Sequence, residues 1–267
     1  MNTDKINKLH QMGLGPVWQR RTHMTASAEV SMVADTAAPL YPTEAAQATA
    51  VVTRRPTAAA NTNATPAYTA IDTDAIAMMD SDTLEASIRS CTRCGLCEGR
   101  QHAVPGTGDR KARWLFVGEG PGVNEDQQGQ PFVGPAGHLL DNMLRALGLA
   151  RGENTYIANI VKCRPTGADG RDRPPSAEEV AACMPYLERQ IALIQPELII
   201  ALGKTAANAL LGLPHDTALS GLRGKAHTHA GVPVVVTYHP AYLLRKPSEK
   251  SKSWQDLCLA QDLLDGR

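Results

Sequence analysis

The chain has 267 residues, 27 Lys and Arg against 27 Asp and Glu, and six cysteines. With 43% hydrophobic and 20% charged residues it can bury a core, and its length suits one large domain or one domain with a tail. Zero net charge argues against a strongly basic polyanion-binding protein. The sequence lacks both an apolar run near the ~20 residues of a membrane span and the apolar core of a secretory signal. We therefore expect a cytoplasmic protein without membrane association.

The start of the chain predicts a tail. Residues 25–70 contain 15 Ala, 9 Thr and 4 Pro without a helical or strand period, and such a segment buries too little apolar surface to offset the entropy lost on folding. We expect a disordered linker over 25–81. Before it, residues 1–24 place Leu14 and Trp18 close to other apolar residues, which fits a short docking helix and, about equally well, a frayed start.

From residue 82 to residue 267, short apolar runs alternate with helical patterns. The β-rich runs are 113–118, 155–161, 197–202 and 232–238. Apolar residues at helical spacing cover 139–147 and 180–194, and a Ser176–Glu179 capping box precedes the second pattern. This alternation predicts an α/β fold, a three-layer αβα sandwich around a mostly parallel four-stranded sheet. Ligands of such sheets bind at the carboxyl ends of the strands.

The cysteines all lie beyond residue 90. Five of them form a C-x2-C-x2-C run followed by two distant members: Cys91, Cys94, Cys97, Cys163 and Cys183. In a reducing compartment, clustered thiols bind metal more often than they form disulfides. Such a set can hold a tetrahedral zinc ion or an iron–sulfur cluster, and the spacing does not separate the two. Cys258 lies in an amphipathic helical pattern, which indicates a small buried hydrophobe.

Two glycine-rich segments and a histidine follow the predicted strands. The segments 118–122 (GEGPG) and 129–134 (GQPFVG) allow backbone N–H groups to approach a ligand closely. The G-x-G-x-G spacing fits a dinucleotide fingerprint poorly, because Pro121 removes one donor. Phe132 stands among turn residues, where a flat ring can stack on a planar ligand. His239 ends the last predicted strand and can donate to a ligand oxygen.

Six motifs in this order resemble the family 4 uracil-DNA glycosylases, the iron–sulfur branch of their superfamily. They are Cys91-x2-Cys94, 118–126 (GEGPGVNED), 129–137 (GQPFVGPAG), 159–165 (NIVKCRP), 183–187 (CMPYL) and 239–245 (HPAYLLR). The resemblance covers about residue 82 to the C-terminus. The stretch 164–175 is a few residues longer than is typical of the family. It lacks the Lys-Arg-Arg-Ile-His insertion of related proteins that bond covalently to uracil in DNA, so ordinary turnover is expected.

The resemblance implies a hydrolase that removes uracil from DNA by cleaving the N-glycosidic bond, the first step of base excision repair. It implies that the base stacks on Phe132 and that Asn159 hydrogen-bonds the polar edge of the base. His239 would donate to the negative charge developing on O2, and backbone N–H groups around Gly120 would complete the anion site. The commonest branch of the superfamily orients water with an Asp at a place that falls on Gly120.

The carboxylates left to position water are then Glu119 and Glu125, and we expect Glu125 also to help exclude the thymine methyl. The resemblance further implies an apolar wedge with a cation that enters the duplex where the base leaves: Leu243, Leu244 and Arg245. It implies a [4Fe-4S] cluster with four ligands, Cys97 being spare: Cys91, Cys94, Cys163 and Cys183.

Uracil-containing DNA is the expected partner, with a replication or repair protein at residues 1–24 as a second one, and we expect a monomer. Two other classes stay open: a non-catalytic iron–sulfur nucleic-acid-binding protein of the same fold, and a zinc-stapled metabolic α/β enzyme. Residues 1–86 hold 6 Lys and Arg against 9 Asp and Glu, a net −3, so the remainder carries +3. Basic residues beside the predicted site would hold a few phosphates: Lys162, Arg164, Arg171, Arg173, Arg245, Lys246, Lys250 and Lys252.

Overall fold

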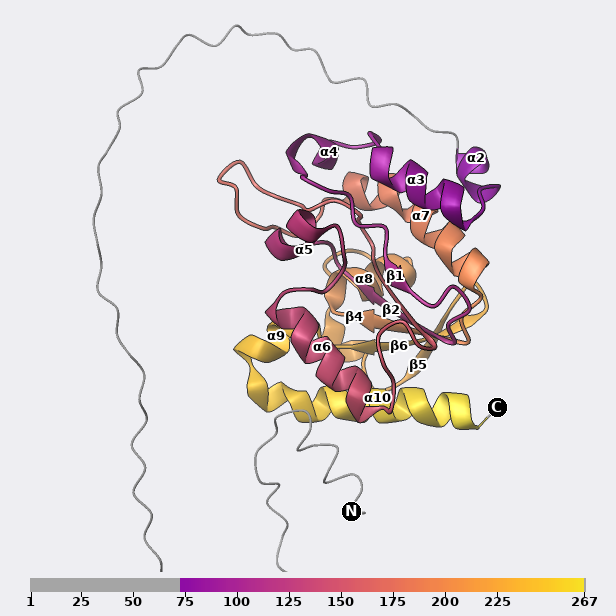
Figure 1. The fold of residues 1–267 in the computed structure, drawn as a ribbon. Helices are drawn as coiled ribbons and strands as arrows, with labels where there is room; N and C mark the ends of the chain where they lie inside the picture. Colours follow the sequence, from indigo (N-terminus) through magenta and orange to yellow (C-terminus); the bar gives the residue numbers. More distant parts are fainter. Residues whose placement is uncertain (1–72, 267) are drawn as a thin grey trace, which may run out of the picture. The chain divides into compact units, whose positions relative to one another are not determined.

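The computed structural model describes residues 73–266 (Figure 1). The helices are α2 (Thr73–Ala77), α3 (Ser81–Ser90), α4 (Leu96–Gly99), α5 (Val123–Gln128), α6 (Pro135–Ala146), α7 (Ala177–Ile194), α8 (Lys204–Leu210), α9 (Pro240–Arg245) and α10 (Lys250–Asp265). The strands are β1 (Thr107–Gly108), β2 (Trp114–Gly118), β3 (Thr155–Asn159), β4 (Leu198–Leu202), β5 (Ala226–His229) and β6 (Val232–Thr237). None of the helices in this part of the chain has the length and apolar character of a membrane span.

The strands form one sheet in the order β1-β3-β2-β4-β6-β5. The four inner strands are parallel and are the four that the apolar runs predict, to within two residues at either end. The edge strands β1 and β5 pair antiparallel and were not predicted. β1 has two residues, and β5 reads AHTH with alternating exposure. Neither edge strand therefore carries an apolar run that could mark it in the sequence.

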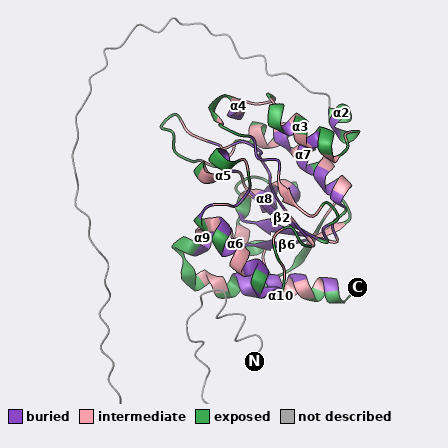
Figure 2. Ribbon diagram, in the orientation of Figure 1, coloured by how far each residue is buried: buried purple, intermediate pink, exposed green. Residues whose placement is uncertain are grey.

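Alternation along the strands builds three layers. Leu115 and Val117 pack on one face of the sheet with buried residues of α3, α7 and α8, whereas Trp114 and Phe116 pack on the other face with α6 and α10. Figure 2 shows buried strands in the middle and helices whose outer faces are exposed. Because successive side chains of a strand point to opposite faces, a fully buried strand needs helices on both sides. The αβα sandwich predicted from the sequence is confirmed.

The fold begins earlier than the predicted boundary at residue 82. Ile76 in α2 is fully buried, and α2 contacts α7. Asp80 is the N-cap of α3 and accepts a hydrogen bond from the Thr83 backbone N–H at 2.8 Å. Residues 73–81, which the composition places in the linker, are therefore part of the fold. The predicted docking segment 1–24 and linker residues 25–72 lie outside the described residues.

Two helix starts position the segments that matter for the site. α6 begins with Pro135, directly after the glycine-rich segment 129–134, and a proline at this position has the φ of a helix and no N–H to leave unpaired. At α7 the predicted capping box forms, because Ser176 Oγ accepts from Glu179 N at 3.2 Å and Glu179 Oε2 accepts from Ser176 N at 2.8 Å. Local sequence signals thus fix where both helices begin.

Candidate active site and cysteine cavity

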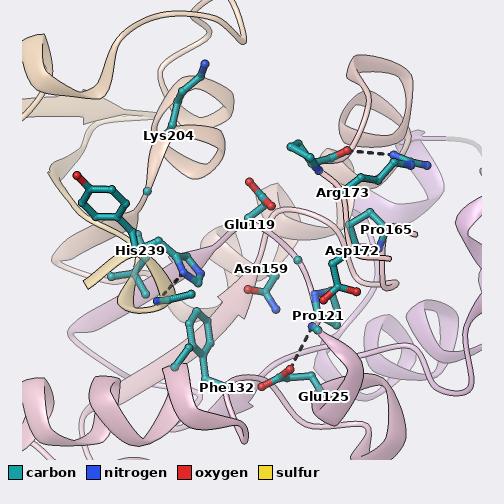
Figure 3. A pocket seen from close by; sticks show the side chains of 18 of the residues that line it. Glu119, Pro121, Glu125, Phe132, Asn159, Pro165, Asp172, Arg173, Lys204 and His239 are labelled. Carbon is teal, nitrogen blue, oxygen red and sulfur yellow. Dashed lines mark hydrogen bonds between the residues drawn. The ribbon is translucent and has the colours of Figure 1, made fainter. Parts of the chain in front are cut away.

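A pocket of about 440 Å³ lies where β2, β3, β4 and β6 end at their carboxyl edge. All six residues predicted to bind or act on the base line it: Glu119, Gly120, Glu125, Phe132, Asn159 and His239. Figure 3 shows Asn159 in the middle of the view, with the other labelled side chains of this set around it. Parallel strands present their carboxyl ends at one edge of the sheet, which is why residues so distant in sequence meet here.

Two glycines allow the Phe132 ring and the Asn159 amide to come together. A Cβ on Gly118 would lie 2.5 Å from both Asn159 Oδ1 and the Phe132 ring. A Cβ on Gly137 would lie 1.8 Å from the Phe132 carbonyl oxygen. Phe132 itself has φ 55°, a left-handed conformation that a bulky residue adopts rarely. The backbone thus holds the ring in the pocket instead of letting it join a strand.

Asn159 brings an unsatisfied acceptor to the pocket. Its side chain is 1% exposed, and its Oδ1 has no hydrogen-bond partner among the described residues. Leaving a buried polar atom unpaired costs about 1–3 kcal/mol, so native proteins rarely do so without a reason. A ligand N–H group that enters the pocket would satisfy this oxygen.

His239 is the N-cap of α9, and the cap defines its tautomer. Nδ1 accepts a hydrogen bond from the Ala241 backbone N–H at 3.1 Å, so the ring proton of the neutral imidazole resides on Nε2. Burial above all, and Arg245 next, lower the pKa of His239 to about 4, against the opposing effect of the Glu125 carboxylate. His239 is therefore a neutral hydrogen-bond donor near pH 7.

The two candidate carboxylates differ in what they contact. Glu125 accepts three backbone N–H bonds, from Gly122 at 3.1 Å, Val133 at 2.8 Å and Gly134 at 2.9 Å. Its carboxylate thereby joins the two glycine-rich segments. Glu119 Oε2 accepts a hydrogen bond from the Thr205 hydroxyl at the start of α8. One carboxylate oxygen of Glu119 therefore accepts a hydrogen bond from the protein, whereas both carboxylate oxygens of Glu125 do so.

The wedge prediction is wrong for Leu243. This residue is fully buried in the core beside α6, whereas Leu244 is 44% exposed and Arg245 is exposed and lines the pocket. Successive residues of a helix point about 100° apart, so Leu243 can pack into the core while the next residue, Leu244, faces solvent. Of the three predicted wedge residues, Leu244 and Arg245 are the two at the surface.

The predicted basic rim is also corrected at Lys162, which is 2% exposed and cannot reach a phosphate on the surface. Arg164 pairs with Asp172 at 2.6 Å, and Arg173 pairs with Glu179 at 2.6 Å. Two further predicted members form surface ion pairs, Arg171 with Asp169 and Lys252 with Glu249. Arg245, which lines the pocket, and its chain neighbour Lys246 are both exposed.

A second, smaller cavity is lined by five of the six cysteines. These are the four predicted ligands and the predicted spare: Cys91, Cys94, Cys163, Cys183 and Cys97. Arg100 Nη1 donates to Cys163 Sγ at 3.1 Å, and the Lys162 backbone N–H donates to Cys183 Sγ at 3.3 Å. Burial raises the pKa of Cys163 to about 11 and that of Cys183 to about 12. Within residues 73–266, no three His, Cys, Asp or Glu side chains form a compact site for a single ion.

Several residues at the two cavities were missed in the sequence. Lys204 lines the pocket directly after β4, and the rule that ligands meet strand ends could have identified it. Thr205 reaches Glu119 from α8. Arg100 contacts the thiol of Cys163, 63 residues further along the chain. No local sequence pattern predicts contacts between residues so far apart in the chain.

The fold and the two cavities define an α/β protein with a ligand pocket at the carboxyl edge of its sheet and a separate thiol-lined cavity. The family model of the uracil DNA glycosylase superfamily matches residues 105–260. The chain belongs to this superfamily and, by the relatives that follow, to its type-4 uracil-DNA glycosylases.

These relatives span most of the folded part. The type-4 uracil-DNA glycosylase of Pyrobaculum aerophilum is 44% identical over 187 residues, which is 68% of this chain and 93% of the relative. That of Archaeoglobus fulgidus is 40% identical over 185 residues, 67% of this chain and 90% of the relative. That of Thermotoga maritima is 43% identical over 164 residues, which is 61% of this chain and 82% of the relative.

Proposed function

We propose that this chain removes uracil from DNA by hydrolysing the N-glycosidic bond and so leaves an abasic site, the first step of base excision repair. The observation that carries the proposal is the buried Asn159 Oδ1, unpartnered among the described residues, beside the Phe132 ring and a neutral His239 in one pocket. A planar base with an N–H group and two carbonyl oxygens has the complementary chemistry. The names of the relatives support uracil in DNA as the substrate.

The base must leave the duplex stack before it can enter the pocket. Phe132 then offers a ring face for stacking, and Asn159 Oδ1 accepts the N3–H of uracil. His239 donates Nε2–H to O2, where negative charge develops as the bond between C1′ and N1 breaks. A donor aimed at the place where charge develops stabilises the transition state more than the ground state.

Glu119 is the carboxylate that we assign to the attacking water. Its Oε2 is anchored by Thr205, which orients the second oxygen relative to the pocket. Glu125 contributes differently, because both of its oxygens hold backbone N–H groups. Its part in excluding the thymine methyl is to hold the segment that carries Phe132 at a fixed distance. Outside the pocket, Leu244 and Arg245 would support the strand from which the base has left.

We further propose that the cysteine cavity holds a [4Fe-4S] cluster on Cys91, Cys94, Cys163 and Cys183. Each iron of such a cluster binds one thiolate, so the ligands surround it, as these side chains surround the cavity. N–H donors already point at two of the sulfurs. When bound, the cluster supplies a crosslink between the segment after α3, the segment after β3 and helix α7, and no chemistry in the pocket.

A cleavage assay tests the glycosylase proposal. The purified protein is incubated with a uracil-containing single strand and then with alkali, which breaks the strand at abasic sites, and a thymine-containing strand is the control. We expect cleavage of the uracil strand alone, and a loss of about 100-fold or more in rate for His239→Ala and Asn159→Ala with melting temperatures near that of the wild type. Binding of the strand without cleavage at any salt concentration would instead support the non-catalytic alternative.

A further inference from the structure

Lys162 is a buried cation that the glycosylase mechanism does not use. Lysine is almost never fully buried unless it is paired, yet Lys162 is 2% exposed. The acceptors recorded for its ammonium are two neutral oxygens, the Asn159 backbone carbonyl at 2.8 Å and Gln190 Oε1 at 2.7 Å. Burying a charged ammonium costs free energy, so we expect Lys162 to have a specific role at this position.

The first contact holds the end of β3. Asn159 is the last residue of the strand, and after it the chain turns away from the sheet, with Ile160 N donating to Gly118 O at 2.9 Å. Lys162 reaches back three residues and donates to the Asn159 carbonyl, which lies at the point where the strand ends. The lysine thereby fixes the backbone from which the Asn159 amide projects into the pocket.

The second contact anchors the lysine itself. Gln190 accepts from Lys162 and donates to the Pro105 carbonyl at 2.8 Å, so one network joins α7, the segment before β1 and the end of β3. Lys162 also lines the cysteine cavity, where its backbone N–H donates to Cys183 Sγ. Lys162 thus touches both the cysteine cavity and the backbone of Asn159.

We propose that Lys162 is a positioning residue, which holds Asn159 in its base-binding orientation and makes that orientation depend on the packing around the cysteine cavity. The inference rests on the proposed function. The ammonium group of Lys162 is tolerated in the interior because the thiolates of Cys163 and Cys183 supply negative charge nearby when they hold a metal.

The test is a double-mutant cycle of single-turnover cleavage rates on the uracil-containing strand, with wild type, Lys162→Met, Asn159→Ala and the double variant. We expect Lys162→Met to lose about 10- to 100-fold in rate, as misplacement of a binding group does, while strand affinity changes less than about threefold. If Lys162 acts through Asn159, the double variant should be no slower than Asn159→Ala, within about twofold, because the two residues then form one unit.

Three further measurements keep the outcome clear. Lys162→Gln retains a neutral donor, and its cleavage rate should fall between those of wild type and Lys162→Met. The double-mutant cycle is also run with Lys162→Gln, so that the test still gives a result if Lys162→Met does not fold. Lys111→Met changes an exposed lysine in the same way and should match wild type. Iron content and visible absorption should be unchanged in the Lys162 variants.

The inference is overturned if the losses multiply in the double variant, if Lys162→Met cleaves within about twofold of wild type, or if iron is lost in step with rate. If the wild-type protein does not cleave the uracil-containing strand, the proposed function itself is contradicted. Failure of the inference about Lys162 and failure of the proposed function therefore give different results.

Discussion

Backbone groups, more than other side chains, determine how the residues of the pocket are oriented. The Ala241 N–H selects the tautomer of His239, and three backbone N–H groups hold the Glu125 carboxylate. Gly118 acts by having no side chain where Phe132 and Asn159 approach each other. Such contacts keep the side chains oriented before a ligand arrives, which is what stabilisation of a developing charge requires.

His239 should be neutral well below its ordinary pKa. Because burial lowers its pKa from 6.5 to about 4, the unfolded state binds more protons than the folded state between these values. The free energy of unfolding should therefore fall as pH drops from 6.5 towards 4, and His239→Asn should lessen that dependence. Nitrogen-15 NMR of the imidazole at pH 6 should show the Nε2–H tautomer. A fully protonated ring at pH 6 would contradict the assignment.

Gly118→Ala should impair base binding. The new Cβ would lie 2.5 Å from Asn159 Oδ1 and from the Phe132 ring, so one of the two must move. Overpacking of this kind costs about 1–3 kcal/mol in stability, and we expect a loss of about tenfold or more in kcat/KM. Gly221→Ala is the matched control, because a Cβ there meets nothing within 4 Å and the residue has no positive φ. Equal activities of the two variants would contradict the proposal that Gly118 leaves space for Phe132 and Asn159 to approach each other.

At the scale of elements, the pocket is made by segments that leave the carboxyl ends of strands and enter helices. α5 lies between the two glycine-rich segments, and α6 starts where the second one ends. In α9, the first turn positions His239 and the last turn exposes Leu244 and Arg245. The residue proposed to act on the base and the residues proposed to contact DNA are therefore carried by the two ends of one short helix.

Glu125 and Glu119 should respond differently to loss of charge. Glu125→Ala removes the group that joins the glycine-rich segments and should lower the free energy of unfolding by about 2–4 kcal/mol, measured by urea denaturation. Glu125→Gln keeps one acceptor oxygen and should retain activity within about tenfold, whereas Glu119→Gln should lose about 100-fold if Glu119 orients the water. A complete loss with Glu125→Gln at unchanged stability would reverse the two roles.

For the whole molecule, the cysteine cavity joins parts of the chain that the sheet does not. It connects the region of α3 and α4, the segment after β3 and helix α7. Arg100 reinforces this connection by donating to the backbone carbonyls of Cys91 and Arg89 as well as to Cys163. Metal binding at such a place contributes to folding free energy, because the ligands are far apart in the unfolded chain.

Removal of single thiols should reveal the ligand set. Cys183→Ser should lower iron and sulfide content and reduce the melting temperature by about 10 °C, as expected for a loss of about 3–5 kcal/mol in a domain of this size. Cys97→Ser should keep the wild-type iron content and visible absorption, because Cys97 lines the cavity without being one of the four proposed ligands. Retention of iron in Cys183→Ser together with its loss in Cys97→Ser would assign Cys97 to the ligand set instead.

The amino-acid sequence by itself determined the four parallel strands, the layers and the start of α7, because an apolar run marks a buried strand and a capping pair marks a helix start. The residues that meet in the pocket were identified by the family resemblance together with the rule that strand ends share one edge of the sheet. Only the tertiary structure decided that Leu243 and Lys162 are buried, that Glu125 holds two loops together, and that residues 73–81 belong to the fold. Burial and pairing of a side chain depend on which distant segments pack against it, and no local pattern in one sequence records that.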